Sequence, residues 1–171
     1  MQHIQMAQAG DLIEILEVLA ACVENMRARG IDQWDEAYPT REKLEADLGA
    51  GNLYVRRGEG RIAGLVVLDQ KQDPEYADVP WEHPAEGAGI VHRLMIAPEF
   101  QGRGMAKELM RAVEAEALRR SLGSIRLDAF TLNPWALRLY RGLGYRETGL
   151  IRLRKGIFQC FEKGLQGFTG R

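Results

Sequence analysis

A chain of 171 residues is long enough to bury a core of its own, and we expect one domain over residues 1–171. Its formal net charge is −1, from 23 basic and 24 acidic side chains, so no overall charge selects nucleic acid or an anionic membrane as a partner. The sequence has no signal-peptide pattern and no apolar run of about eighteen residues, and we therefore expect a soluble cytoplasmic protein.

The first fifty residues predict one strand and two helices. Alternating residues predict a strand at 2–7, and apolar residues at helical spacing predict a helix over 9–29. Thr40 is the expected N-cap of a short helix over residues 41–51. The apolar stripe that we expect the first helix to bury comprises Leu12, Ile15, Leu16, Leu19 and Val23.

The rest of the chain alternates strands with helices. Residues 52–70 have the pattern of a hairpin, in which two β-rich runs flank Gly58-Glu59-Gly60. Segment 71–89 is polar, contains proline and is too long for a tight turn, so we expect it to be flexible or functional. This order favours a sheet that is partly parallel and partly antiparallel. Further strands are predicted at 89–98, 124–132 and 145–165, and helices at 107–120 and 133–145.

A glycine-rich turn, Gln101 to Ala106, joins a predicted strand to a predicted helix. At such a junction several backbone N–H groups are unpaired and point to one place, which suits phosphate oxygens. Gly102 and Gly104 remove Cβ atoms that would keep a diphosphate from the backbone, and Arg103 could add a charge contact. A P-loop lysine and serine are absent, and Lys107 stands where a dinucleotide fingerprint needs a third glycine. The alternative is a helix start that needs flexible entry.

Two motifs in this sequence resemble those of the GNAT superfamily of acyl-CoA-dependent N-acyltransferases. The first, Gln/Arg-x-x-Gly-x-Gly/Ala, stands here as Gln101-x-x-Gly104-x-Ala106. The second is Asn-x-x-Ala-x-x-x-Tyr with a following Gly-aromatic pair, and it matches at Asn133, Ala136, Tyr140, Gly144 and Tyr145. The resemblance covers the whole chain and implies an α/β (α+β) GNAT fold. That fold is a mixed twisted sheet of about seven strands, splayed between the fourth and fifth, with about four helices.

The resemblance also implies the ligand and the reaction. It makes the bound anion the pyrophosphate of coenzyme A and the protein an enzyme of EC class 2.3.1, an N-acetyltransferase. Such an enzyme transfers the acetyl group of acetyl-CoA directly to a primary amine of a small molecule or peptide, without a metal. The implied CoA contacts are Leu94, Met95, Ile96, Gln101, Gly102, Arg103, Gly104, Met105, Ala106, Asn133, Ala136 and Tyr140.

By the same resemblance, two residues of the second motif act on the thioester end of the ligand. Asn133 would bond the pantetheine arm, and Tyr140, on the same helix face, would give a proton to the leaving thiolate as general acid. Backbone N–H groups near Leu94 to Ile96 would stabilise the charge that develops on the carbonyl. The alternatives are that Asn133 is a helix N-cap before Pro134 and that Tyr140 is a core residue.

Two residues are candidates for the base that deprotonates the amine, Asp128 and His92. Each occupies a strand position that carries a base in some relatives, although many family members have no dedicated base. Adjacent strands could bring the two together. The alternatives are a strand-end histidine bonded to backbone and a carboxylate paired with Arg126 or Arg93.

Two segments rich in acidic and aromatic residues are candidates for the acceptor pocket. Residues 27–40 contain Trp34 and Tyr38 beside acids, and residues 73–87 contain Tyr76 and Trp81 beside acids. Acidic and aromatic groups suit a cationic amine, such as an amino acid, polyamine, aminoglycoside or peptide N-terminus. The alternative is that the aromatic residues pack the fold while the acids face water.

Other functions remain open on the sequence alone. The chain could be a CoA-binding sensor without turnover, or it could transfer a longer acyl chain. Cys22 and Cys160 have no partners at zinc-like spacing and no motif residue nearby in sequence, so we expect reduced core thiols. A homodimer formed through residues 151–165 is a further expectation by similarity.

Overall fold

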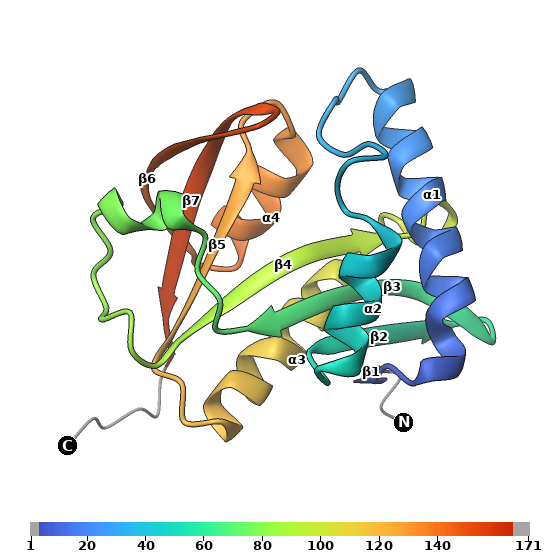
Figure 1. Cartoon of the computed structure of the whole chain (residues 1–171), viewed down its shortest axis with the longest axis horizontal. Helices are drawn as coiled ribbons and strands as arrows, with labels where there is room; N and C mark the ends of the chain where they lie inside the picture. The colour runs from blue at the N-terminus through green and yellow to red at the C-terminus, as the bar shows by residue number, and fades with distance from the viewer. Residues whose placement is uncertain (1–3, 166–171) are drawn as a thin grey trace. The chain divides into compact units, whose positions relative to one another are not determined.

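The computed structural model describes residues 4–165, which form two compact units (Figure 1). The first unit comprises residues 4–68 and 92–112, and the second comprises 69–91 and 113–165. Seven strands pair in the order β1-β2-β3-β4-β5-β7-β6, and β4 contributes to both units. This mixed sheet and the α-helices confirm the expected fold class, while the single domain over 1–171 stays a prediction.

The elements follow the predicted order along the chain. The strands are β1 (Ile4–Met6), β2 (Leu53–Gly58), β3 (Arg61–Asp69), β4 (Ala88–Ile96), β5 (Ser124–Phe130), β6 (Arg146–Leu153) and β7 (Gly156–Gly164). The α-helices of the described residues are α1 (Leu12–Ala28), α2 (Arg41–Gly49), α3 (Met105–Arg119) and α4 (Pro134–Gly142). Short 3-10 helices are η1 (Ala9–Asp11), η2 (Pro74–Asp78) and η3 (Pro98–Phe100). No helix among these is long and apolar enough to cross a membrane.

In the first unit, α1 and α2 lie next to one another beside the β2–β3 hairpin (Figure 1). The hairpin turns at Glu59 and Gly60, whose φ angles of 53° and 79° give the left-handed conformation that a two-residue turn requires. Thr40 caps α2 as predicted, because its hydroxyl accepts a 3.2 Å hydrogen bond from the backbone N–H of Lys43.

The buried face of α1 differs from the predicted stripe. Its buried residues are Ile15, Val18 and Cys22, of which only Ile15 belongs to that stripe. The remaining predicted residues, Leu12, Leu16, Leu19 and Val23, are half-buried. The stripe was centred on the leucines, whereas the helix turns the smaller Val18 and Cys22 inward and leaves the leucines along the margin of the contact.

A glycine in β3 lets that strand approach the end of β4. A Cβ at Gly64 would lie 2.5 Å from Cδ1 of Ile96 and 2.7 Å from the Met95 carbonyl oxygen. Both distances are far below ordinary contact, so a side chain at this position would displace the residues at which β4 ends. Gly64 therefore fixes the backbone that leads into the glycine-rich turn.

In the second unit, β5 pairs along its full length with β7, from Ser124 opposite Gly164 to Phe130 opposite Phe158. The parallel ladder between β4 and β5 comprises Ala88 to Ile90, and β4 begins one residue before the predicted strand 89–98. Both strands continue beyond this ladder, which agrees with the expected parting of the fourth and fifth strands.

Candidate active site

The glycine-rich turn lies in the first unit, between the end of β4 and the start of α3. Gly102 and Gly104 have φ angles of 76° and 80°, a backbone conformation that residues with a Cβ rarely adopt. A Cβ at either position would meet nothing within 4 Å, so the space above both glycines is open. The first amides of α3, those of Met105 and Ala106, have no acceptor inside the helix. The residues present therefore fit a phosphate group.

The carbonyl of Ile96 ties this turn to the sheet and to α1. It accepts a 3.1 Å hydrogen bond from Nε2 of Gln101 and a 3.2 Å hydrogen bond from the thiol of Cys22. Gln101 thus holds the start of the turn against the last residue of β4. The Cys22 contact could not be expected from sequence, because 74 residues separate its partners.

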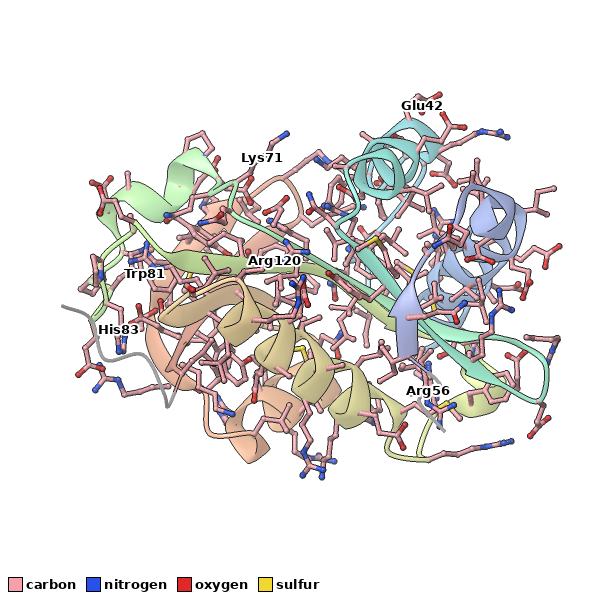
Figure 2. The ribbon with its side chains drawn as sticks, turned by 90° about the horizontal axis from the view of Figure 1, so that it is seen from below. Glu42, Arg56, Lys71, Trp81, His83 and Arg120 are labelled. Atoms are coloured by element: carbon pink, nitrogen blue, oxygen red, sulfur yellow. The ribbon has the colours of Figure 1, made fainter. Side chains whose placement is uncertain are left out.

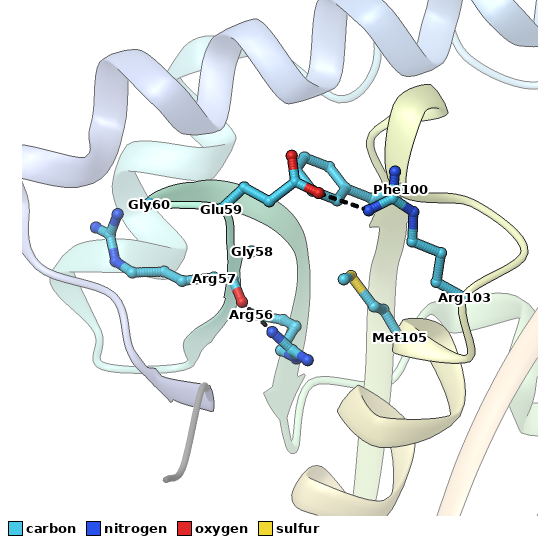
Figure 3. A pocket seen from close by; sticks show the side chains of 8 residues that line it. All are labelled: Arg56, Arg57, Gly58, Glu59, Gly60, Phe100, Arg103 and Met105. Atoms are coloured by element: carbon cyan, nitrogen blue, oxygen red, sulfur yellow. Dashed lines mark hydrogen bonds and ion pairs between the residues drawn. The ribbon is translucent and has the colours of Figure 1, made fainter.

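Arg103 is already engaged next to the turn. Its guanidinium donates 2.7 Å to Glu59 and 2.9 Å to the Glu99 carbonyl, and it stacks 5.1 Å from the Phe100 ring centroid. Arg103 also lines a pocket of about 460 Å³ between the β2–β3 turn and the start of α3 (Figure 3). The other lining residues are Arg56, Arg57, Gly58, Glu59, Gly60, Phe100 and Met105.

Carboxylates compensate the arginines of this pocket. Arg56 binds Glu108 at 2.7 Å, and Arg57 binds Asp11 at 2.5 Å. Glu59 is the partner of Arg103, and Figure 3 shows this ion pair in front of Phe100. Because each guanidinium already has an acidic partner, the pocket carries less free positive charge than its three arginines suggest.

Arg93, in the middle of β4, has an unusual conformation. Its φ of 53° is rare for a residue with a side chain, and the side chain is buried. The guanidinium lies 2.7 Å from Asp47 of α2 and donates a 2.7 Å hydrogen bond to the hydroxyl of Tyr38. Arg93 therefore joins β4 to α2 and to segment 27–40.

Asp128, in the second unit, meets a residue to which sequence reasoning gave no catalytic part. Its Oδ2 accepts a 2.7 Å hydrogen bond from the hydroxyl of Tyr76, which is 1% exposed. Asp128 itself is half-buried. Arg126, the other suggested partner, binds Gln72 and the His83 carbonyl and lies 3.6 Å from Glu162. No sequence signal pointed to the contact between Tyr76 and Asp128, because it arises from tertiary packing alone.

Tyr140 is buried in the second unit between two aromatic rings. The ring centroids of Tyr145 and Phe161 lie 5.9 Å and 5.6 Å from that of Tyr140. Burial, followed by the charge of Asp128, raises the pKa of the Tyr140 phenol above its usual value. Tyr140 is therefore fully protonated at neutral pH and is available as a proton donor.

Asn133 is the N-cap of α4. Its side chain accepts a 3.2 Å hydrogen bond from the backbone N–H of Ala136, and Pro134 occupies the first helical position. This capping alternative is therefore correct, while a contact of Asn133 or Ala136 with pantetheine stays a prediction.

His92 is half-buried and belongs to the first unit, whereas Asp128 belongs to the second. Their expected meeting also stays a prediction.

The two candidate acceptor segments differ in burial. Trp34 is 9% exposed, which fits the packing interpretation, while Tyr38 is 38% exposed and its hydroxyl binds Arg93. Segment 71–87, the part of the predicted segment 71–89 that precedes β4, contains η2 and places Tyr76 in the core. Figure 2 shows Trp81 and His83 of this segment at the same end of the second unit.

Both cysteines are free and buried, as predicted, although each contacts or faces a candidate site residue. Cys22 donates to Ile96, and Cys160 stands opposite Asp128 in the β5–β7 ladder. Burial raises the pKa of both thiols from 9.0 to about 12, with a smaller contribution from Glu99 for Cys22 and from Asp128 for Cys160. A thiol with so high a pKa is a poor nucleophile at neutral pH.

We expect both thiols to resist modification in the native protein. At pH 8, below both values, the raised pKa lowers the thiolate fraction by about a thousandfold relative to an ordinary cysteine. A disulfide-exchange reagent such as DTNB should therefore react slowly with native protein and rapidly in urea. A thiol that reacts at pH 8 as fast as free cysteine would contradict this expectation and would favour a cysteine nucleophile.

Comparison with known proteins shows the family of this chain. The sequence matches the acetyltransferase (GNAT) family over residues 15–145. It is 28% identical to N-acetyltransferase 8B of Mus musculus over 97 residues, which are 57% of this chain and 38% of the mouse protein. It is 35% identical to mycothiol acetyltransferase of Acidothermus cellulolyticus over 107 residues, covering 62% of this chain and 28% of that protein.

A solved structure agrees over nearly the whole length. The paiA N-acetyltransferase of Thermoplasma acidophilum, in complex with coenzyme A, matches with a TM-score of 0.75 and 17% identity over 94% of this chain and 97% of that chain. This similarity shows that the two chains share a fold. The chain belongs to the GNAT acetyltransferase family. It spans well under half the length of the two curated relatives.

Proposed function

We propose that this protein transfers the acetyl group of acetyl-CoA directly to a primary amine of a small molecule or peptide. The observation that carries the proposal is the turn between β4 and α3, where two glycines in the left-handed conformation leave open space in front of helix-terminal amides. Membership of the GNAT family supports coenzyme A as the phosphate-bearing ligand of this turn. The thermoplasmal neighbour, which holds coenzyme A, supports that choice.

Each predicted site residue then has a definite task. The amides of Gln101 through Ala106 would hold the pyrophosphate, and backbone N–H groups of Leu94 to Ile96 would stabilise the carbonyl oxygen as it gains charge. Acetyl-CoA would supply the acetyl group as a thioester. Asn133 would contact the pantetheine arm in addition to capping α4.

Proton transfers complete the reaction. The amine must lose a proton before it attacks, and Asp128 or His92 would accept that proton. As the new C–N bond forms and the C–S bond breaks, Tyr140 would give its phenolic proton to the leaving sulfur. The raised pKa of Tyr140 keeps that proton in place at neutral pH. No bond to an enzyme side chain is needed, which agrees with the two protonated, buried cysteines.

The test combines binding with turnover. Calorimetry with coenzyme A should show binding at one site per chain, and free-thiol release from acetyl-CoA should appear with one class of primary amine. The panel comprises amino acids, polyamines, aminoglycosides and peptides with free N-termini, and propionyl-CoA and octanoyl-CoA serve as longer donors. Binding without turnover on any amine or donor would favour a CoA sensor. Failure to bind coenzyme A would overturn the proposal.

A further inference from the structure

We propose that Tyr76 is a positioning residue for Asp128, and that the folded segment 71–87 holds the Tyr76 hydroxyl against that carboxylate. The inference rests on the proposed function, because it takes Asp128 as the group that binds and deprotonates the acceptor amine. It adds a residue that lies outside both sequence motifs. It also assigns a task to a segment that sequence patterns could describe only as flexible or functional.

The contact between the two residues is short and lies largely out of water. The Tyr76 hydroxyl donates 2.7 Å to Oδ2 of Asp128, and Tyr76 is 1% exposed. A hydrogen bond to a carboxylate is stronger than one between neutral groups, and low local polarity strengthens it further. Asp128 remains half-buried, so part of it can meet a ligand. The bond favours the carboxylate form and restricts rotation of the side chain.

The phenol ring is fixed by its own segment. Pro74 begins η2, which carries Tyr76 in its single turn. Trp81 then folds back, so that its Nε1 donates 2.9 Å to the Tyr76 carbonyl and its ring centroid lies 5.0 Å from that of Tyr76. The main chain and the ring of Tyr76 are therefore both held, and the hydroxyl has little freedom to leave Asp128.

Arg126 of β5 contacts the segment at Gln72 and again at His83. Its guanidinium donates 2.6 Å to Oε1 of Gln72 and 2.5 Å to the His83 carbonyl, and it lies 4.5 Å from the Trp81 ring centroid. Successive side chains of a strand alternate between its two faces, so Arg126 and Asp128 share one face of β5. The same face therefore carries the anchor of the segment and the carboxylate that the segment reaches.

Glu162 of β7 adds a second anchor. It stands opposite Arg126 in the ladder, and it accepts backbone hydrogen bonds of 2.8 Å from Glu82 and 3.1 Å from His83. Removing one partner of this buried ion pair is costly, because the remaining charge would be left without compensation. The two strands thus anchor the segment at Glu82 and His83.

Three side chains that interact electrostatically with Asp128 are neutral at pH 7. Burial raises the pKa of Tyr76 on η2, Tyr140 on α4 and Cys160 on β7, and the charge of Asp128 raises each of these pKa values further. Asp73 and Arg126 interact electrostatically with Tyr76. Because the three groups stay neutral, none of them cancels the carboxylate charge that would attract an ammonium and then take its proton.

The test replaces Tyr76 with phenylalanine, which keeps the ring and removes only the hydroxyl. We expect kcat/KM for the amine to fall by about ten- to a hundredfold at pH 7, while KM for acetyl-CoA changes less than about twofold. The acidic limb of the kcat/KM profile should move to higher pH, because the carboxylate loses a donor that stabilises it. The deficit should therefore shrink as pH rises. An equal deficit at every pH would overturn the inference.

Two further variants give the controls. Tyr145→Phe removes a buried phenol that donates 3.0 Å to Glu114, a bond of the same kind at a place that the proposed site does not use. It should leave the acidic limb in place. In an Asp128→Asn background, Tyr76→Phe should have little additional effect on the amine kinetics. A full additional loss in that background would show that Tyr76 acts elsewhere and would overturn the inference.

A measurement without turnover separates this inference from the proposed function. Carbon-13 NMR of the Asp128 side-chain carboxyl, followed from pH 2 to pH 9, should show titration at higher pH in Tyr76→Phe than in the wild type. An unchanged titration overturns the role of Tyr76, whatever the kinetics show. If the shift appears but no amine is acetylated, the proposed function fails while the Tyr76–Asp128 coupling stands.

Discussion

Replacing Tyr140 with phenylalanine is expected to lower kcat for acetyl transfer by about a hundred- to ten-thousandfold, the range typical of losing a general acid. The ring would still pack between Tyr145 and Phe161, because those contacts involve the aromatic faces and not the hydroxyl. Coenzyme A affinity, measured by calorimetry, should therefore change little. A variant that retains more than about a third of wild-type kcat would show that Tyr140 is a core residue and not the acid.

The pH dependence of kcat in the wild-type protein gives an independent test of Tyr140 as the general acid. A general acid works only while it is protonated, so kcat is full below its pKa and falls as pH rises through it. Burial raises the pKa of Tyr140 above 10.0, so the limb that belongs to this group should lie above pH 10. The matched control is Tyr145→Phe, which loses a buried hydroxyl beside the same ring and should retain kcat within about threefold.

The second large effect concerns folding stability. Asp47→Asn is expected to lower the free energy of unfolding by about 3–5 kcal/mol, because it leaves the Arg93 guanidinium buried without its charged partner. The two side chains are only 2% and 5% exposed and lie 2.7 Å apart. Urea denaturation followed by tryptophan fluorescence measures the change.

The control for this substitution lies on the same helix. Glu42 is an exposed carboxylate in the first turn of α2, and Figure 2 shows it at the outer surface. Glu42→Gln should change stability by less than about 1 kcal/mol. Combining Arg93→Met with Asp47→Leu should recover part of the loss, since neither charge is then left alone. A loss below about 1 kcal/mol for Asp47→Asn would contradict the importance of the pair.

Local sequence signals predicted much of the fold. The Thr40 cap and the hairpin around Glu59 and Gly60 depend on neighbouring residues, and both are present in the structure. The prediction of the buried face of α1 was partly wrong, because helical spacing alone leaves two adjacent stripes nearly equal in apolar content. Only packing against the sheet selects the stripe that contains Val18 and Cys22.

The sequence predicted the part of the candidate site that is formed by backbone. It could not predict contacts between side chains that are far apart in the sequence. Two glycines indicate the turn between β4 and α3, since the left-handed backbone conformation of this turn favours glycine. The bond from Tyr76 to Asp128 spans 52 residues, and the bond from Cys22 to Ile96 spans 74. Neither bond corresponds to a recognisable spacing or composition in the sequence. The contacts of Arg93 with Asp47 and Tyr38 were missed for the same reason.

The anchoring of segment 71–87 bears on how such a protein can change during evolution. Its fixed points are Arg126 and Glu162, which belong to β5 and β7, and Tyr76, which lies in the core. Between them the segment carries the exposed acids Glu75 and Asp78, which lie outside the hydrogen bonds of those anchors. Selection can therefore alter the surface charge of the segment one residue at a time without moving Tyr76. A lineage of such proteins could change the charge of this surface while the contact between Tyr76 and Asp128 is inherited unchanged.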